Sequence, residues 1–197
     1  SSTCEMITDL IFNTRLKMNE EIARNLYVGI VTDSDRFLLT TTSSHTLLVC
    51  SKLISDYNIN LTEIYNHIYQ RPLNEFKFQA YLALNMSVTE NGFAYIKITN
   101  EMINEFNVDS GTASNMVNNF NFIKDYVVWA FVSYDERQEL YKVNIRSRGP
   151  VINEIATKYH GGGHKYASGA RISNEEDVDK LFKELDDACK KYNEEAL

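Results

Sequence analysis

Apolar residues recur at helical spacing through the first seventy positions. They predict helices over about 1–16, 19–30, 45–54 and 61–69, each preceded by residues that cap helices well. The stripe expected to be buried on the first helix comprises Met6, Ile7, Leu10, Ile11 and Leu16. Arg71-Pro72 interrupts the pattern, and a further helix is expected over 73–84. Its expected apolar anchors are Phe76, Tyr81 and Leu84.

The period changes to that of strands near residue 86. Segments 86–90 and 93–99 flank Asn91-Gly92, a strong signal for a β-hairpin. Residues 126–133 are almost continuously apolar and predict a central strand buried on both faces. In 139–147 apolar and polar residues alternate, which sends Arg146 to the face opposite Val143 and Ile145. An amphipathic helix follows Ser173.

These elements predict an α/β protein in three parts. Residues 1–70 would form a helical unit and 71–85 a connector helix. Residues 86–197 would form a small α/β domain around a central mixed sheet of about five strands.

The segment from Asn144 to Gly169 carries the densest chemistry. Two arginines, Arg146 and Arg148, lie where the strand ends, and Gly161-Gly162-Gly163-His164 follows a short helix. Successive glycines let the backbone approach a ligand closely, and their N–H groups can bind an anion. Arginines add fork-shaped, charge-assisted bonds to phosphate, and His164 could bond a phosphate oxygen or move a proton. The pattern favours a phosphate or nucleotide site over a plain helix stop followed by a surface histidine.

Two further features allow a functional and a structural interpretation. Asp33 follows an apolar run, so it could present an oxygen ligand to Mn²⁺ or Mg²⁺, or it could cap a turn. The asparagines between 115 and 121 could contact a base or ribose, or be solvated.

Composition limits the classes of function. The net charge of −7 disfavours binding to long duplex nucleic acid but not to a small anionic substrate. Three widely spaced cysteines, Cys4, Cys50 and Cys189, predict buried free thiols. The sequence contains no run that could span a bilayer and no signal peptide, which predicts a cytoplasmic protein without a membrane partner. The chain opens without an initiator methionine, as though inside a fold.

Two motifs, in this order, resemble the DHH phosphoesterase family. Residues 29–37, GIVTDSDRF, are similar to the last metal-binding motif of its catalytic domain. Residues 146–152, RSRGPVI, with GGGH at 161–164 and ASG at 167–169, are similar to its C-terminal substrate domain. The likeness covers essentially the whole chain and is greatest to bacterial NrnA-type members, which act as nanoRNases and pAp phosphatases.

The resemblance implies a role for each matched residue. Asp33 would be a metal ligand, normally for Mn²⁺. The phosphate-gripping strand would comprise Arg146, Ser147 and Arg148, and the loop for the nucleotide end Gly161, Gly162, Gly163 and His164. Two residues depart from the pattern, because the family usually has glycine at the position of Asp35 and often at that of His160. The family's first three motifs are absent, which implies the C-terminal part of a longer enzyme, inactive alone.

The implied function is Mn²⁺-dependent degradation of short oligoribonucleotides to mononucleotides and dephosphorylation of pAp to AMP. Two Mn²⁺ ions would activate a water for attack on phosphorus. One alternative is hydrolysis of a linear dinucleotide or of polyphosphate on the same scaffold. Another is a nucleotide- or RNA-binding module without catalysis, and a plain structural domain is the remaining possibility. An oligomer is compatible with each.

Overall fold

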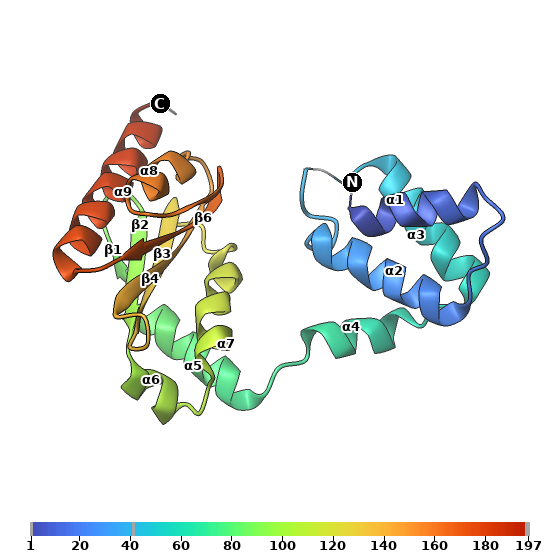
Figure 1. Ribbon diagram of the computed structural model, residues 1–197, viewed down its shortest axis with the longest axis horizontal. Coiled ribbons are helices and arrows are strands. Elements are labelled where there is room, and N and C mark those ends of the chain that lie inside the picture. Colours follow the sequence, from blue (N-terminus) through green and yellow to red (C-terminus); the bar gives the residue numbers. More distant parts are fainter. Residues whose placement is uncertain (1, 41, 196–197) are drawn as a thin grey trace. The chain divides into compact units, whose positions relative to one another are not determined.

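The protein consists of two compact units, described here from a computed structural model that covers residues 2–40 and 42–195. Unit 1 is Ser1–Gln70 and unit 2 is Arg71–Leu197. Figure 1 shows that unit 1 is helical, whereas unit 2 combines a sheet with helices.

The described part of unit 1 contains four helices: α1 (Thr3–Phe12), α2 (Glu20–Asp33), α3 (Ser44–Tyr57) and α4 (Leu61–Tyr69). The side chains of four capping residues accept hydrogen bonds from the first turns of these helices, as this residue class predicts. They are Ser2, Asn19, Ser43 and Asn60. The core of the unit lies among α2, α3 and α4, around Ile30, Val31 and Leu53.

The apolar stripe expected on the first helix is wrong for four of its five members. Met6, Ile7 and Leu10 are exposed, as is Leu16, which lies beyond the end of α1, and Ile11 is partly buried. Glu5 and Thr8 are buried instead. Their polar atoms are satisfied, because the Glu5 carboxylate accepts a hydrogen bond from Thr46 Oγ1 and the Thr8 hydroxyl donates to the Cys4 carbonyl. Paired polar groups can occupy an interior that periodicity assigns to apolar ones.

Unit 2 is built on a six-stranded mixed sheet with the order β1-β2-β3-β4-β6-β5. The strands are β1 (Ser87–Val88), β2 (Phe93–Ile98), β3 (Val128–Asp135), β4 (Leu140–Ser147), β5 (Gly162–His164) and β6 (Ala167–Ile172). The pair β2 and β3 is parallel, and the other neighbours are antiparallel. The sixth strand, β5, is formed by the glycine segment that was expected to be a loop.

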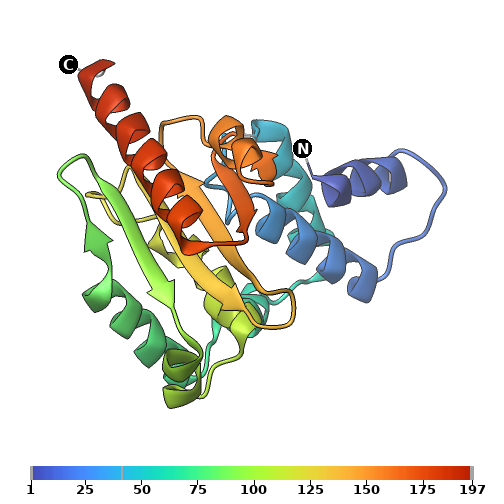
Figure 2. The ribbon, with the colours of Figure 1, turned by 60° about the vertical axis from the view of Figure 1, so that its left-hand side comes forward.

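Helices cover both faces of this sheet, as Figure 2 shows. On one face lie α8 (Asn153–Lys158) and α9 (Glu175–Glu195), which pack on β2, β3 and β6. On the other lie α5 (Leu73–Asn85), α6 (Asn100–Glu105), α7 (Ser110–Asn115) and the 3₁₀ helix η1 (Met116–Phe120). Strand β3 is buried on both sides, which confirms the expectation for 126–133.

Helix α5 packs against the sheet through a different face from the one expected. Phe78 and Leu82 are fully buried in the core of unit 2. Phe76 and Leu84, expected to be anchors, are exposed, and Tyr81 is partly buried.

Two expectations from composition concern cysteines and membranes. All three cysteines are free, with Cys50 and Cys189 buried and Cys4 only partly so. Burial raises the pKa of Cys50 to about 11 and that of Cys189 to about 12, so both are thiols at neutral pH. Across the described ranges, every helix is too short or too polar to cross a membrane.

Candidate anion-binding site

Strand register places two of the expected binding residues in one row across the sheet. Arg146 on β4 pairs with Ala167 on β6, which pairs with His164 on β5. Cross-strand partners point to the same face of a sheet, so Arg146 and His164 share a face two strands apart. It is the face that carries Trp129, which pairs with Arg146 from β3.

Arg146 is half-buried and held in place by neighbouring acceptors. Its Nε donates to Asn118 Oδ1 at 2.8 Å and its Nη1 to the Ile145 carbonyl at 2.9 Å. Burial lowers the pKa of this guanidinium, which nevertheless remains protonated at neutral pH. No carboxylate pairs with Arg146 among the described residues, so its charge is available to a bound anion. Asn118, one of the clustered asparagines, thus has a positioning contact.

Ser147 and Arg148 use their polar atoms inside the protein. The Ser147 side chain is buried on the opposite face, and its hydroxyl donates to the Pro150 carbonyl at 2.6 Å. The Arg148 guanidinium donates to the carbonyls of Asn121, Ile123 and Lys124. These contacts favour a role in shaping the loops beside the site. Direct contact of either residue with a substrate stays a prediction.

Gly161, Gly162 and Gly163 differ in the space that surrounds their Cβ positions. A Cβ on Gly161 would lie 2.0 Å from the Gly169 carbonyl oxygen, and one on Gly163, where φ is +132°, would lie 2.6 Å from that of Ala167. Both positions therefore require glycine for the close approach of β5 to β6. A Cβ on Gly162 would meet nothing within 4 Å. Gly162 therefore leaves its space open on the side where a ligand can approach.

That open space belongs to a cavity of about 540 Å³ beside β4, β5 and β6. Gly161, Gly162 and Gly169 supply its glycine surface. Lys142, Asn144 and Arg171 line it from the strands, and Ser114 from α7. The alternation along 139–147 already assigned Lys142 and Asn144 to the face of Arg146, but the sequence pattern did not single out Arg171 or Ser114, which only the strand pairing brings there.

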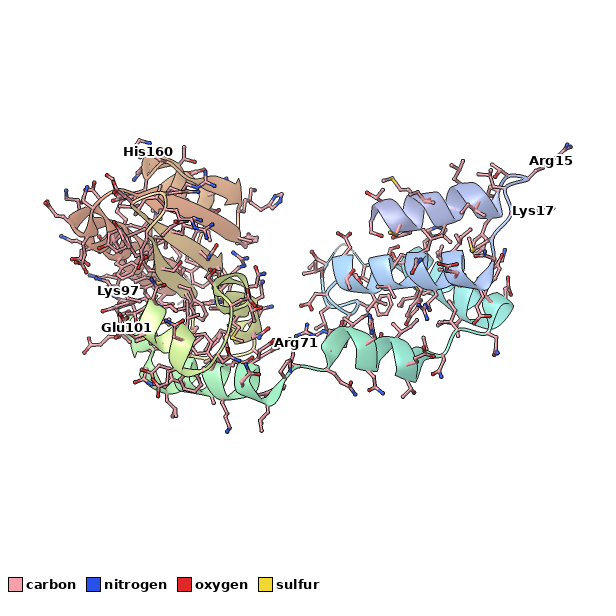
Figure 3. The ribbon with its side chains drawn as sticks, turned by 60° about the horizontal axis from the view of Figure 1, so that its bottom comes forward. Arg15, Lys17, Arg71, Lys97, Glu101 and His160 are labelled. Carbon is pink, nitrogen blue, oxygen red and sulfur yellow. The ribbon has the colours of Figure 1, made fainter. Side chains whose placement is uncertain are left out.

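The two departures from the family pattern occupy equivalent backbone positions. Asp35 (φ +44°) follows α2, and His160 (φ +55°) follows the C-cap of α8. In each case the next N–H closes a Schellman-type bond, Arg36 to Val31 at 2.8 Å and Gly161 to Ala156 at 3.0 Å. Glycine fits this left-handed position best, which gives its use in the family a physical reason. Figure 3 labels His160, at the end of unit 2 opposite α5.

Asp33, the expected metal ligand, is the exposed last residue of α2. Its carboxylate lies at the helix end where the dipole disfavours negative charge, and within the described residues it makes no hydrogen bond or ion pair. The capping alternative is not borne out, because the Ser34 hydroxyl accepts the Phe37 N–H instead.

The residues around Asp33 do not make a metal centre by themselves. Asp33 shares a small cavity of about 10 Å³ with Glu5, whose carboxylate is hydrogen-bonded to Thr46. In ranges 2–40 and 42–195, no three His, Cys, Asp or Glu side chains gather to hold an ion. A site for Mn²⁺ or Mg²⁺ needs several oxygen ligands, so these residues fit one ligand of such a site and not the whole.

Comparison with known proteins gives the class of protein to which this mixed sheet and its glycine-bounded cavity belong. The model of the DHHA1 domain matches residues 90–191. The chain belongs to the DHH phosphoesterase family and carries its DHHA1 domain.

Similar proteins include enzymes named for nucleotide chemistry. The bifunctional oligoribonuclease and PAP phosphatase NrnA of Bacillus subtilis is 35% identical over 195 residues, which are 98% of this chain and 61% of that protein. The probable NrnA of Streptococcus mutans is 33% identical, over 96% of this chain and 61% of that protein. This chain therefore spans about three fifths of the length of these relatives.

A solved structure shares the fold. The crystal structure of an exopolyphosphatase-related protein from Bacteroides fragilis has a TM-score of 0.82 and 28% identity. The match covers 98% of this chain and 57% of the other.

Proposed function

We propose that this chain captures the substrate of a phosphoesterase that degrades short oligoribonucleotides to mononucleotides and dephosphorylates pAp to AMP. Arg146 and His164 would bind a substrate phosphate, and the glycines of β5 would admit the adjoining nucleoside. The partners are accordingly short RNA and pAp, which matches the names of the relatives from Bacillus subtilis and Streptococcus mutans.

The observation that carries this proposal is the cross-strand row of Arg146 and His164 beside the cavity. Arg146 is held by Asn118 and Ile145, with a half-buried charge that has no carboxylate partner in the described residues. An anion that reaches it gains charge-assisted hydrogen bonds without the cost of ordering a mobile side chain.

Asp33 would contribute one oxygen ligand to a Mn²⁺ ion in the full catalytic assembly, where the metal would activate a water for attack on phosphorus. The remaining ligands are not gathered among the described residues, so no catalytic step is assigned to this chain. The same observation favours a second candidate function. In it, the chain alone is a nucleotide- or RNA-binding module without catalysis.

The test is equilibrium binding of 5′-labelled RNA dinucleotide and of pAp to the purified chain, by fluorescence anisotropy and by competition. Arg146→Gln and His164→Gln should each weaken binding about tenfold, since each removes a charge-assisted or polar phosphate contact. Lys183→Gln is the matched control, because Lys183 is an exposed lysine on α9, away from the site.

Equal affinity of the parent chain and Arg146→Gln for both ligands would overturn the assignment of the phosphate clamp. Release of mononucleotide by the purified chain with Mn²⁺ would exclude the purely binding function. Displacement of RNA by polyphosphate but not by pAp would favour the polyphosphate alternative.

A further inference from the structure

The cavity beside the Arg146–His164 row is cationic in an acidic protein. The chain carries a net charge of −7, yet the cavity is lined by Lys142, His160 and Arg171, and by no carboxylate from the described residues. Arg171 is exposed and has no ion-pair partner in the described part of the chain. A local excess of positive charge on an acidic surface marks a place for an anion.

Lys142 and Arg171 form a second row, parallel to the first. They are direct cross-strand partners on β4 and β6, so both point to the face of Arg146 and His164. Lys142 and Arg146 are four residues apart on β4, which places their Cα atoms about 13 Å apart in an extended strand.

Contacts with neighbouring residues hold the cationic side chains of the two rows apart, so that they do not bind the same phosphate. The Lys142 ammonium pairs with Asp135 at 2.5 Å, and the Arg146 guanidinium is held by Asn118. Lys142 thus has a partly neutralised charge, and Arg171 is the main free cation of its row. The rows are therefore two separate cationic poles, each suited to its own phosphate.

A third row between the poles is suited to a nucleoside. Asn144 pairs with Gly169, and Gly169 pairs with Gly162, so the surface beside the Asn144 side chain has no side chains of its own. Backbone without side chains lets a ribose or a flat base approach closely. The Asn144 amide, which makes no hydrogen bond within the described residues, offers a donor and an acceptor.

We propose that Arg171 and Lys142 form a second phosphate subsite, and that Asn144 with Gly162 and Gly169 receives the nucleoside between the two phosphates. The inference rests on the proposed function and names its substrate more closely as a nucleotide chain with at least two separated phosphates. Ligands with one phosphate occupy the Arg146–His164 row alone. Longer ligands reach both rows and bind more tightly.

The test is affinity as a function of ligand length, measured with the whole chain and 5′-phosphorylated oligoadenylates of one to five nucleotides. For the parent chain, affinity should rise at the length that reaches the second row. In Arg171→Gln this rise should be lost, about tenfold in affinity, whereas shorter ligands bind as before. Arg171→Lys, which keeps the charge, should retain most of the rise. Lys183→Gln, with the same change of charge on α9, should follow the parent at every length.

The outcomes separate the two claims. Overlap of Arg171→Gln with the parent at every length, with the fold intact by circular dichroism, would remove the second subsite and leave the proposed function standing. No binding of any ligand by the parent chain would overturn the proposed function, and the subsite with it. Equal weakening of all lengths in Arg171→Gln would assign Arg171 to general attraction and contradict a distinct subsite.

Discussion

At residue 35 the chain carries an aspartate in a conformation that suits glycine. Its φ of +44° is followed by +61° at Arg36 and +67° at Phe37. A left-handed conformation costs an L-residue about 1–2 kcal/mol, and Asp tolerates it better than most. This strained turn directly follows Asp33, the candidate metal ligand. Backbone strain of this kind is common at functional sites, so the position of these three residues next to Asp33 favours a functional role for Asp33.

Replacement of Asp35 tests the strain directly. Asp35→Gly should stabilise unit 1 by about 0.5–1 kcal/mol, after the greater entropy of glycine in the unfolded chain is allowed for. Asp35→Ala should destabilise it, because alanine has the steric cost without a polar side chain to offset it. Amide hydrogen exchange along α2 measures both. Equal stability of the two variants would contradict a left-handed residue 35.

Residues 35 and 160 are recognisable in the sequence as departures from a family pattern, but their left-handed backbone conformations are not. Backbone φ depends on how the helix ends and where the next segment turns, and Asp and His are common in many conformations. In the same way, the sequence named Arg146 and His164, whereas Arg171 needed the strand pairing. A single arginine in an alternating segment such as 167–172 does not indicate which residues of other strands will lie beside it.

In the hairpin of β5 and β6, neighbouring glycines serve packing at one position and ligand access at the next. A Cβ on Gly161 would collide with the Gly169 carbonyl oxygen, whereas a Cβ on Gly162 would point into open space. Adjacent glycines in one motif thus have different reasons for lacking a side chain.

Substitution of Gly161 should therefore affect stability, and substitution of Gly162 should affect binding. Gly161→Ala should cost about 1–3 kcal/mol through overpacking against the β6 backbone. Gly162→Ala should change stability by less than about 0.5 kcal/mol, as expected for a site without close neighbours, while it lowers the affinity for short RNA. Chemical denaturation with Trp129 fluorescence gives the first quantity and anisotropy the second. A loss of stability in Gly162→Ala as large as that in Gly161→Ala would contradict the open space at the Cβ position of Gly162.

At the element scale the sequence predicted the type of element better than its buried face. Helix α5 has large apolar residues on several sides, among them Leu73, Phe76, Phe78 and Leu82, so periodicity alone does not select a face. On α1 the buried positions are Glu5 and Thr8, which a hydrophobic pattern cannot find. The glycine segment forms strand β5 because β6 supplies its hydrogen-bond partners. The pairing of these two strands depends on the tertiary fold, so the local sequence does not reveal it.

On the scale of the whole molecule, each unit has a core of its own. Leu53 is fully buried in unit 1 and Leu185 in unit 2. The single tryptophan of the chain, Trp129, is buried in unit 2, where its indole N–H donates to the Val117 carbonyl at 2.7 Å. Fluorescence therefore reports on unit 2, whereas far-ultraviolet circular dichroism reports on both units.

We expect these two probes to give transitions that do not coincide, because separate cores need not unfold together. Leu53→Ala and Leu185→Ala form a matched pair, each expected to cost its own unit about 2–5 kcal/mol. Leu53→Ala should shift the dichroism transition and leave the fluorescence midpoint unchanged, and Leu185→Ala should shift the fluorescence midpoint. A shift of the fluorescence midpoint by Leu53→Ala would show that the units unfold as one.

The order of strands also bears on how the protein behaves when it is crowded. Its most apolar strand, β3, lies inside the sheet, and the two outermost strands are β1, of two residues, and β5, of three. A sheet edge recruits another chain by offering a long row of unpaired N–H and C=O groups. Strands this short offer few such groups, and the glycines of β5 have no side chains with which to form a dry interface. The segment that opens the cavity to a ligand is thus also a poor template for the addition of a strand from another molecule.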